Sequence, residues 1–138
     1  MGRAFVDTNV LLYAFDPTEP AKQRAAQAVL SSVAGDAVVS AQVLGEFYVN
    51  ATRKLQPPLT QVAAAAAVRQ LMESPVVSVD AELVRRAIEL QDGYPISYWD
   101  ALVVASAASA GCDRLLTEDL ADGDTILGVR IENPFRGL

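Results

Sequence analysis

Aspartate and glutamate are the residues of this chain with the clearest chemical potential, because histidine is absent from its 138 residues. Without histidine there is no Ser-His-Asp or Cys-His nucleophile pair, no imidazole general base and no usual zinc site. The sequence also contains neither a Gly-x-Gly-x-x-Gly motif nor a Walker phosphate-binding loop. If the protein is an enzyme, carboxylates must do most of its chemistry.

Acidic residues stand at several points where polar sequence borders apolar sequence. Asp7 and Asp119 each follow a short apolar run that is typical of a strand. Asp100 precedes a run of small and aliphatic residues, and Glu46 lies in an apolar helical stretch where we expect little contact with solvent. In an open parallel sheet, ligands bind outside the carboxyl ends of the strands, so these acids could share one site.

Each of these acids also has a purely structural interpretation. Asp7 could cap a helix, and Ser97-Tyr98-Trp99-Asp100 matches a capping box. Glu46 could pair with Arg53, and Asp119 could lie in a surface turn. That all of them are structural is the weaker hypothesis, because an α/β sheet would bring several of these positions to one edge.

The elements expected around these acids alternate between short apolar runs and helical patterns. Such alternation predicts right-handed βαβ crossovers and an α/β fold with a central parallel sheet of four to five short strands, flanked by helices on both faces. We expect one domain over residues 1–138. The predicted strands are 3–6, 37–39, 76–79, 114–117 and one or two extended segments in 125–131; the predicted helices are 8–15, 20–33, 41–55 (capped by Ser40), 61–72 (capped by Thr60), 81–91 and 98–110.

Composition describes a globular and acidic protein, with 51% hydrophobic residues, 20% charged residues and a net charge of -6. This charge argues against a protein that coats nucleic acid, but a nuclease with carboxylates awaiting cations would also be acidic. The single cysteine, Cys112, excludes an internal disulfide, and we expect it to be buried. No targeting signal or apolar run of roughly 20 residues is visible, so we expect a cytoplasmic protein without a membrane span.

Carboxylates gathered in one pocket would repel one another unless cations neutralised them. Oxygen ligands without histidine or cysteine suit Mg²⁺ or Mn²⁺. With no histidine base, a metal ion must lower the pKa of the attacking water. Phosphodiester cleavage is the reaction class that most often uses this arrangement.

At this point the sequence resembles a known family, the PIN-domain ribonucleases, and among them the VapC-type toxins of type II toxin–antitoxin systems. The likeness spans residues 4 to about 131. The opening Asp-Thr-Asn is moderately specific alone, and the segments in order are strongly specific. The residues that carry it are Phe5-Val6-Asp7-Thr8-Asn9-Val10-Leu11, Glu46, Tyr98-Trp99-Asp100-Ala101 and Leu115-Leu116-Thr117-Glu118-Asp119-Leu120.

The resemblance implies in-line hydrolysis of RNA by metal-activated water, leaving a 5′-phosphate and a 3′-hydroxyl. It also implies a homodimer and a small antitoxin that binds a groove beside the active site. Asp122 is a possible further acid, although Asp119 matches the motif better. The residues implied are Asp7, Glu46, Asp100 and Asp119 as catalytic acids that bind one or two Mg²⁺ or Mn²⁺ ions, with Thr8 or Asn9, and Thr117, supporting the pocket.

Two surface features are further hypotheses about partners. Arg53 lies on the helical stripe of Glu46 and could contact an RNA phosphate or an antitoxin acid, the alternative being a salt bridge on a solvated face. Apolar residues are dense in the first and third helices, and we expect some of them to line an exposed groove or dimer contact. These residues are Leu12, Tyr13, Phe15, Phe47 and Tyr48.

Three alternatives remain open from the sequence. A haloacid-dehalogenase-like phosphoryl-transfer enzyme also has an aspartate after its first strand, but it needs a second aspartate where this chain has Asn9. A receiver domain needs a lysine after a late strand, and the lysines here, Lys22 and Lys54, come too early. The third alternative is a catalytically inactive PIN fold used for binding.

Overall fold

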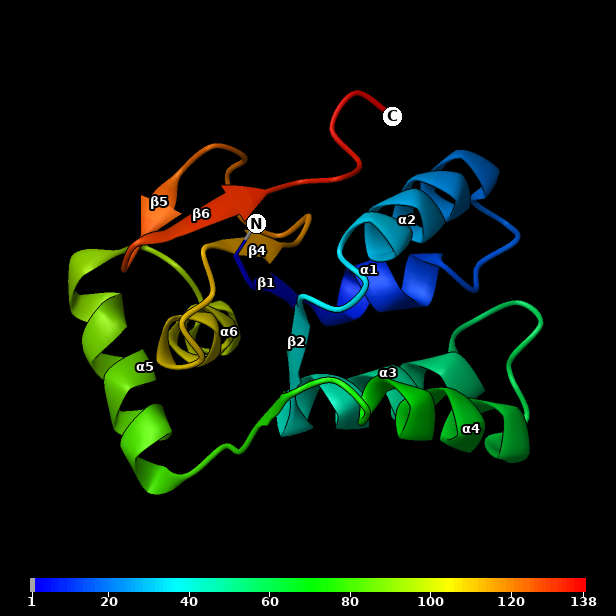
Figure 1. The fold of residues 1–138 in the computed structure, drawn as a ribbon, viewed down its shortest axis with the longest axis horizontal. Coiled ribbons are helices and arrows are strands. Elements are labelled where there is room, and N and C mark those ends of the chain that lie inside the picture. The colour runs from blue at the N-terminus through cyan, green and yellow to red at the C-terminus, as the bar shows by residue number, and fades with distance from the viewer. Residues whose placement is uncertain (1) are drawn as a thin grey trace.

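The computed structural model describes residues 2–138, which form a sheet with helices on both sides (Figure 1). The predicted order of strands and helices is confirmed, with ends that differ by a few residues. The elements in chain order are β1 (Ala4–Val6), α1 (Thr8–Tyr13), α2 (Pro20–Ser32), β2 (Ala37–Ser40), α3 (Ala41–Arg53), α4 (Gln61–Leu71), β3 (Val76–Val77), α5 (Ala81–Gly93), α6 (Tyr98–Ser109), β4 (Arg114–Leu116), β5 (Thr125–Ile126) and β6 (Val129–Glu132).

The strands lie in the order β3-β2-β1-β4-β6-β5 and are parallel except for β5, which pairs antiparallel with β6. The sheet therefore has six strands where the sequence predicted four to five. The difference arises in the last extended segment, which turns back on itself. Leu127 and Gly128 both have positive φ, 52° and 77°, and this turn makes a hairpin of β5 and β6.

The register of the central strands sets the position of the residues that follow them. Val6 of β1 lies opposite Leu116 of β4, and Leu116 lies opposite Glu132 of β6. Because β1 and β4 are parallel neighbours, Asp7 and Thr117 leave the sheet side by side at the same edge. This carboxyl edge is where the sequence predicted the acids to meet.

Helices α5 and α6 lie to one side of the strands, and α1 to α4 lie to the other (Figure 1). Residues 101–107 of α6 are all buried, because this helix packs between the sheet and α5. The predicted caps are confirmed: the hydroxyl of Ser40 accepts from the backbone N–H of Val43, and that of Thr60 accepts from Ala63. Each cap fixes where its helix leaves the preceding segment.

The core has few polar interruptions. Phe5, Leu115 and Ile131 are fully buried in the three central strands, as continuous apolar runs predicted. Cys112 is buried as expected, and burial raises the pKa of its thiol to about 11. None of the helices within residues 2–138 has the length and apolar character to cross a membrane.

Candidate active site

Asp7 is the first residue beyond β1 and is buried, with 6% of its surface exposed. One carboxylate oxygen accepts from the backbone N–H of Thr8 at 2.8 Å, so Asp7 does cap α1. The other oxygen accepts from the hydroxyl of Thr117, also at 2.8 Å, across from the end of β4. Asp7 is therefore both a helix cap and a member of a polar cluster.

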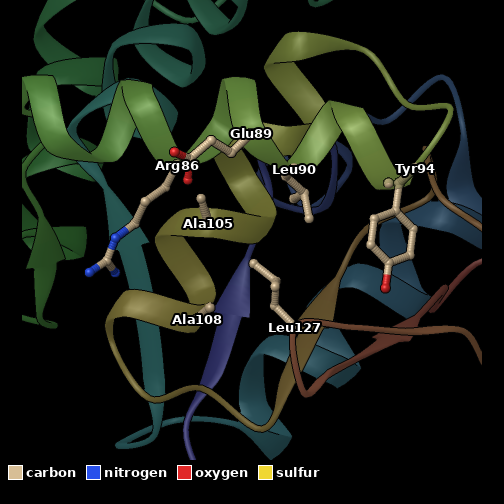
Figure 2. A pocket seen from close by; sticks show the side chains of 8 residues that line it. Arg86, Glu89, Leu90, Tyr94, Ala105, Ala108 and Leu127 are labelled. Carbon is tan, nitrogen blue, oxygen red and sulfur yellow. The ribbon is translucent and has the colours of Figure 1, made fainter.

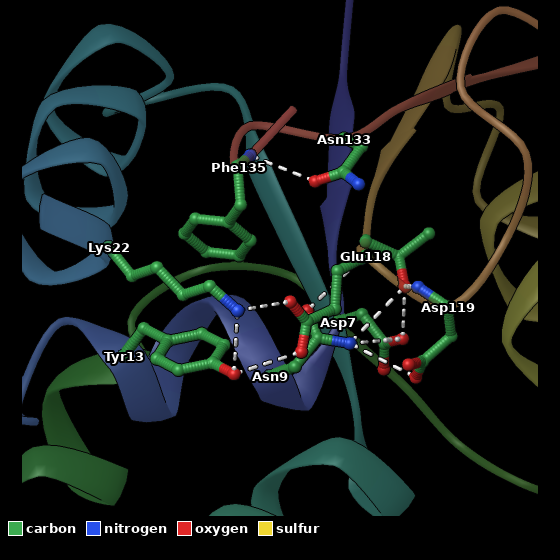
Figure 3. A network of polar contacts seen from close by, with 9 residues as sticks. Asp7, Asn9, Tyr13, Lys22, Glu118, Asp119, Asn133 and Phe135 are labelled. Carbon is green, nitrogen blue, oxygen red and sulfur yellow. Dashed lines mark hydrogen bonds and ion pairs between the residues drawn. The ribbon is translucent and has the colours of Figure 1, made fainter. Parts of the chain in front are cut away.

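The side-chain amide of Asn9 lies between the two strand ends (Figure 3). Its Nδ2 is 3.4 Å from Oδ2 of Asp7, 3.1 Å from Oδ2 of Asp119 and 3.3 Å from the hydroxyl of Thr117. Its Oδ1 accepts from the backbone N–H of Glu118 at 3.4 Å, which fixes the orientation of the amide. A neutral donor thus joins two carboxylates that come from distant parts of the chain.

Glu46 reaches the same cluster from α3, where its Oε2 accepts from the hydroxyl of Thr8 at 3.3 Å. Its Oε1 accepts from the amide of Gln42 at 2.6 Å. The expectation that Glu46 avoids solvent is wrong, because its side chain is exposed. The apolar face of α3 is formed by Val43 and Phe47, which are fully buried, and Glu46 lies off that face, at the rim of the site.

Asp100 lies in the first turn of α6 and is half-buried. The hydroxyl of Ser97 accepts from the backbone N–H of Asp100 at 3.1 Å, so the serine half of the predicted capping box is present. The reciprocal bond, from the backbone N–H of Ser97 to the Asp100 carboxylate, is not among the hydrogen bonds within residues 2–138. The cap therefore uses the backbone N–H of Asp100.

Electrostatic coupling links these carboxyl groups. The pKa of Asp7 is raised to about 6, chiefly by burial; Asp119 and Glu46 also raise it, while the bonds from Thr117 and Thr8 act in the opposite direction. Burial also raises the pKa of Asp100; Asp119 and Glu46 contribute in the same direction and Ser97 opposes them. The expected repulsion between the acids is present, but burial is the larger cause of both shifts.

A small pocket of about 190 Å³ opens where several of these side chains meet, lined by Asp7, Thr8, Asn9, Leu12, Glu46, Asn50 and Asp119. A groove of about 280 Å³ adjoins it and shares Asn9, Leu12 and Asn50. The groove continues over Tyr13, Asp16, Lys54, Leu55 and Glu118. A polymeric ligand that reached the carboxylates could therefore extend along the surface between α1 and α3.

A larger pocket, about 380 Å³, lies elsewhere, between α5, α6 and the β5–β6 turn (Figure 2). Ala108 in its wall belongs to the end of α6, whereas Asp100 belongs to the beginning of that helix. Leu127 precedes β6 and so lies at the amino edge of the parallel strands. This mostly apolar pocket contains none of the predicted site residues and is at the opposite edge from the carboxylates.

The donor chemistry of the site suits a hard divalent cation, because its ligands would be carboxylate and hydroxyl oxygens. The acids nevertheless do not close on a single point: within residues 2–138, no group of three or more acidic or cysteine side chains is arranged to hold a metal ion. The amide of Asn9 takes the place between Asp7 and Asp119.

Two other predicted residues lie apart from the cluster. Asp122 accepts from the backbone N–H of Asn133 at 2.8 Å and pairs with Arg136 at 2.8 Å, and these contacts lower its pKa. Arg53 is exposed in the last turn of α3. Its proposed pairing with Glu46 is absent from the ion pairs formed by residues 2–138. Asp122 thus fastens the C-terminal segment, and Arg53 remains available to a partner.

Sequence reasoning missed a second group of polar residues next to the cluster. Lys22 lies 3.2 Å from both the carboxylate of Glu118 and the hydroxyl of Tyr13, which itself donates to Glu118 at 3.1 Å (Figure 3). The contact between Lys22 and Glu118 joins residues 96 positions apart, so no local sequence pattern indicates it.

Some of the apolar residues of the first and third helices line a groove, as expected, and others are buried. Phe47 is fully buried and packs against Phe15, which is 41% exposed, with ring centroids 5.6 Å apart. Leu12 and Tyr13 are partly buried and line the groove beside the carboxylates. The dense aromatic residues therefore serve the core as well as the groove.

Comparison with protein families matches residues 4–121 to the PIN domain. The chain belongs to the PIN-domain family. This membership decides against the haloacid-dehalogenase-like and receiver-domain alternatives. No curated protein matches the chain by sequence.

Several solved structures share the fold. A chain of a toxin–antitoxin complex from Klebsiella pneumoniae is 21% identical with a TM-score of 0.72, covering 96% of this chain and 98% of that chain. The sarcin-ricin loop cleaving toxin VapC20 of Mycobacterium tuberculosis is 24% identical with a TM-score of 0.64, covering 88% and 91%. A DNA-bound VapBC structure from Salmonella typhimurium gives 19% and 0.67, covering 97% and 99%. At these identities the likeness concerns the fold.

Proposed function

We propose that this PIN-domain protein is a divalent-cation-dependent endoribonuclease that acts as the toxin of a toxin–antitoxin pair. The observation that carries the proposal is the convergence of Asp7 and Asp119 on one amide, that of Asn9, at the carboxyl edge of the sheet. Glu46 lines the same pocket from α3. Asp119 and Glu46 each raise the pKa of both Asp7 and Asp100, which supports one shared site that includes Asp100 of α6.

In this proposal the catalytic groups are also the cation ligands. One or two Mg²⁺ or Mn²⁺ ions would lower the pKa of a bound water and offset the charge of the phosphodiester. The chain itself supplies the negative charge that holds the ions, and the hydroxyl and amide donors that keep the carboxylates in place. The ligands would be Asp7, Glu46, Asp100 and Asp119, and the supporting residues Thr8, Asn9 and Thr117.

The reaction would be hydrolysis of RNA that leaves a 5′-phosphate and a 3′-hydroxyl. Because the chain contains no histidine, no imidazole is available to take a proton from the nucleophile. The structural relatives favour RNA as the substrate, since VapC20 is described as cleaving the sarcin-ricin loop. The groove that adjoins the carboxylate pocket could bind the RNA strand on one side of the scissile bond.

The expected protein partner is a small antitoxin. Among the similar folds are toxin–antitoxin complexes, one of them from Klebsiella pneumoniae. The groove beside the site combines the apolar side chains of Leu12 and Leu55 with charged side chains of both signs, a surface suited to a peptide segment; the charged residues are Asp16, Lys54 and Glu118. We also propose a homodimer, which light scattering over a range of concentrations would test.

Incubation of the purified protein with total RNA tests the central proposal. Cleavage should require Mg²⁺ or Mn²⁺, stop in EDTA and yield products that a 5′-phosphate-dependent exonuclease degrades. Undiminished cleavage in EDTA would contradict the cation-dependent mechanism. If RNA stays intact under all conditions while an antitoxin still binds, the catalytically inactive binding fold is the better account.

A further inference from the structure

Glu118 lies between Thr117 and Asp119 in the chain, yet its side chain points away from the carboxylate cluster (Figure 3). One of its oxygens accepts from the hydroxyl of Tyr13 at 3.1 Å, and the other lies 3.2 Å from Nζ of Lys22. A fifth acid is thereby held outside the site by contacts from α1 and α2. The adjacent acids Glu118 and Asp119 thus have different partners: Tyr13 and Lys22 contact Glu118, and Asn9 contacts Asp119.

Lys22 is itself fixed by aromatic rings. Its Nζ lies 4.6 Å from the ring centroid of Tyr13 and 5.8 Å from that of Phe135, and these two rings meet edge to face at 4.9 Å. The side chains of Lys22 and Glu118 are each only 25% exposed. An ion pair that is partly shielded from water, hydrogen-bonded and packed on aromatic rings is more stabilising than an exposed surface pair.

The backbone of Glu118 connects this pair to the carboxylates. Its N–H donates to Oδ1 of Asn9 at 3.4 Å, and the opposite end of that amide donates to Asp7 and Asp119. Asn9 and Tyr13 are also one turn apart on α1, so the same helix presents both contacts. Fixing the side chain of Glu118 therefore fixes the group that orients Asn9.

We propose that Lys22 is a positioning residue for the carboxylate site. It neutralises Glu118, keeps that acid out of the cluster, and through the Glu118 backbone holds the amide of Asn9 between Asp7 and Asp119. No hydrogen bond or ion pair within residues 2–138 joins Lys22 to the four proposed ligands, so its action is indirect. The inference rests on the proposed function insofar as the site binds a cation.

Substitution of Lys22 by methionine keeps the aliphatic stem and removes the charge. Glu118 would then be a half-buried carboxylate with Tyr13 as its remaining donor, free to turn toward the other acids. Outer contacts that orient metal ligands typically change cation affinity by roughly 10-fold to 100-fold when removed. Loss of the Lys22 charge by itself favours a nearby cation, but we expect the lost orientation of Asn9 to outweigh it. Lys22→Met should therefore weaken Mn²⁺ binding by about that factor, and Lys22→Arg, which keeps the charge, should weaken it less.

The ion pair between Arg114 and Glu132 provides a matched control. It has the same length, 3.2 Å, and similar side-chain exposures of 20% and 34%. Arg114 begins β4, at the opposite end of that strand from Thr117, and only the backbone carbonyl of Glu132 contacts the site, where it accepts from the N–H of Thr117. Arg114→Met should lower the melting temperature about as much as Lys22→Met does, while Mn²⁺ affinity stays at the wild-type value.

Two measurements on the full chain decide the matter. In the cation-free protein, the side-chain NH₂ resonances of Asn9 should shift or broaden in Lys22→Met and remain unchanged in Arg114→Met. Calorimetric Mn²⁺ titration should then compare the Lys22→Met/Glu118→Gln double variant with the two single variants. The double variant should bind Mn²⁺ no more weakly than the single variant with the lower affinity, because both substitutions act on one contact. Unchanged Asn9 resonances, or additive losses of affinity, would overturn the positioning role. A wild-type protein that ignores Mn²⁺ would instead contradict the proposed function, and the Asn9 resonances would still test Lys22.

Discussion

The side-chain nitrogen of Asn9 lies 3.1 Å from a carboxylate oxygen of Asp119, although 110 positions separate the two residues in the chain. The contact follows from topology, because β1 and β4 are parallel neighbours whose carboxyl ends meet at one edge. The same nitrogen faces Asp7. A neutral hydrogen-bond donor therefore lies between two carboxylates and reduces the repulsion between their charges.

Asn9→Asp should reverse that effect, since it replaces the donor with a third negative charge at nearly the same shape. We expect a lower melting temperature in EDTA, and a larger rise on addition of Mn²⁺ than the wild type shows. Asn50→Asp adds the same charge at the pocket wall without a contact to Asp7 or Asp119, and should have the smaller effect. Equal melting temperatures for Asn9→Asp and the wild type in EDTA would show that Asn9 does not separate the acids.

Asp7 should make the cation-free protein less stable as the pH rises. Its pKa is about 6 in the fold, against 3.8 for an ordinary aspartate, so the folded state holds the proton more tightly. Below about pH 4 both states are protonated and there is no cost. As the pH rises to about 6, the free energy of unfolding falls by up to about 3 kcal/mol. This follows because the two pKa values differ by roughly 2, and each pKa unit corresponds to roughly 1.36 kcal/mol.

Asp7→Asn should remove that pH dependence and melt higher than the wild type near neutrality in EDTA. Chemical denaturation at a series of pH values would measure it. If the two proteins show parallel stability profiles, the ionisation of Asp7 has no cost in the fold, and the clustered site loses its main electrostatic support.

Variants of Asp100 and Ser97 distinguish the effect of the Asp100 charge on stability from the effect of the helix cap. Asp100→Asn keeps the backbone N–H that Ser97 accepts and removes a half-buried charge, so it should raise the melting temperature in EDTA. Ser97→Ala should lower stability by about 0.5–2 kcal/mol through loss of the cap. Excess Mn²⁺ should stabilise the wild type by roughly 2.7 kcal/mol at a hundredfold excess over its dissociation constant. If Asp100→Asn melts lower in EDTA and the wild type ignores Mn²⁺, Asp100 is structural.

Much of this arrangement could be predicted from the sequence because strand ends and caps are local signals. The apolar runs around Asp7 and Thr117 fixed the strands, and parallel topology placed their ends together. The exposure of Glu46 could not be predicted in this way, since it depends on which face of α3 meets the core. Lys22 and Glu118 are 96 positions apart in the sequence, so no local pattern predicts their contact.

Arg53 and Lys54 should contribute to binding more than to folding. Lys54 lines the groove beside the carboxylates, and Arg53 is exposed at the end of the same helix. Arg53→Ala and Lys54→Ala should each weaken binding of RNA or antitoxin while melting temperatures stay near the wild-type value. Fluorescence anisotropy in EDTA, without cleavage, measures this. A variant that melts lower but binds normally would identify its side chain as a structural surface group.

The most direct test of the account is the RNA cleavage rate of single charge-removing variants in saturating Mn²⁺. Asp7→Asn, Glu46→Gln, Asp100→Asn and Asp119→Asn should each lower the rate by orders of magnitude while circular dichroism shows an intact fold. Asp122→Asn is the matched control, because Asp122 lies three residues beyond Asp119 yet is held by Asn133 and Arg136, and it should cleave at close to the wild-type rate. Near-wild-type rates for both Asp7→Asn and Asp100→Asn would contradict a carboxylate-based ribonuclease site.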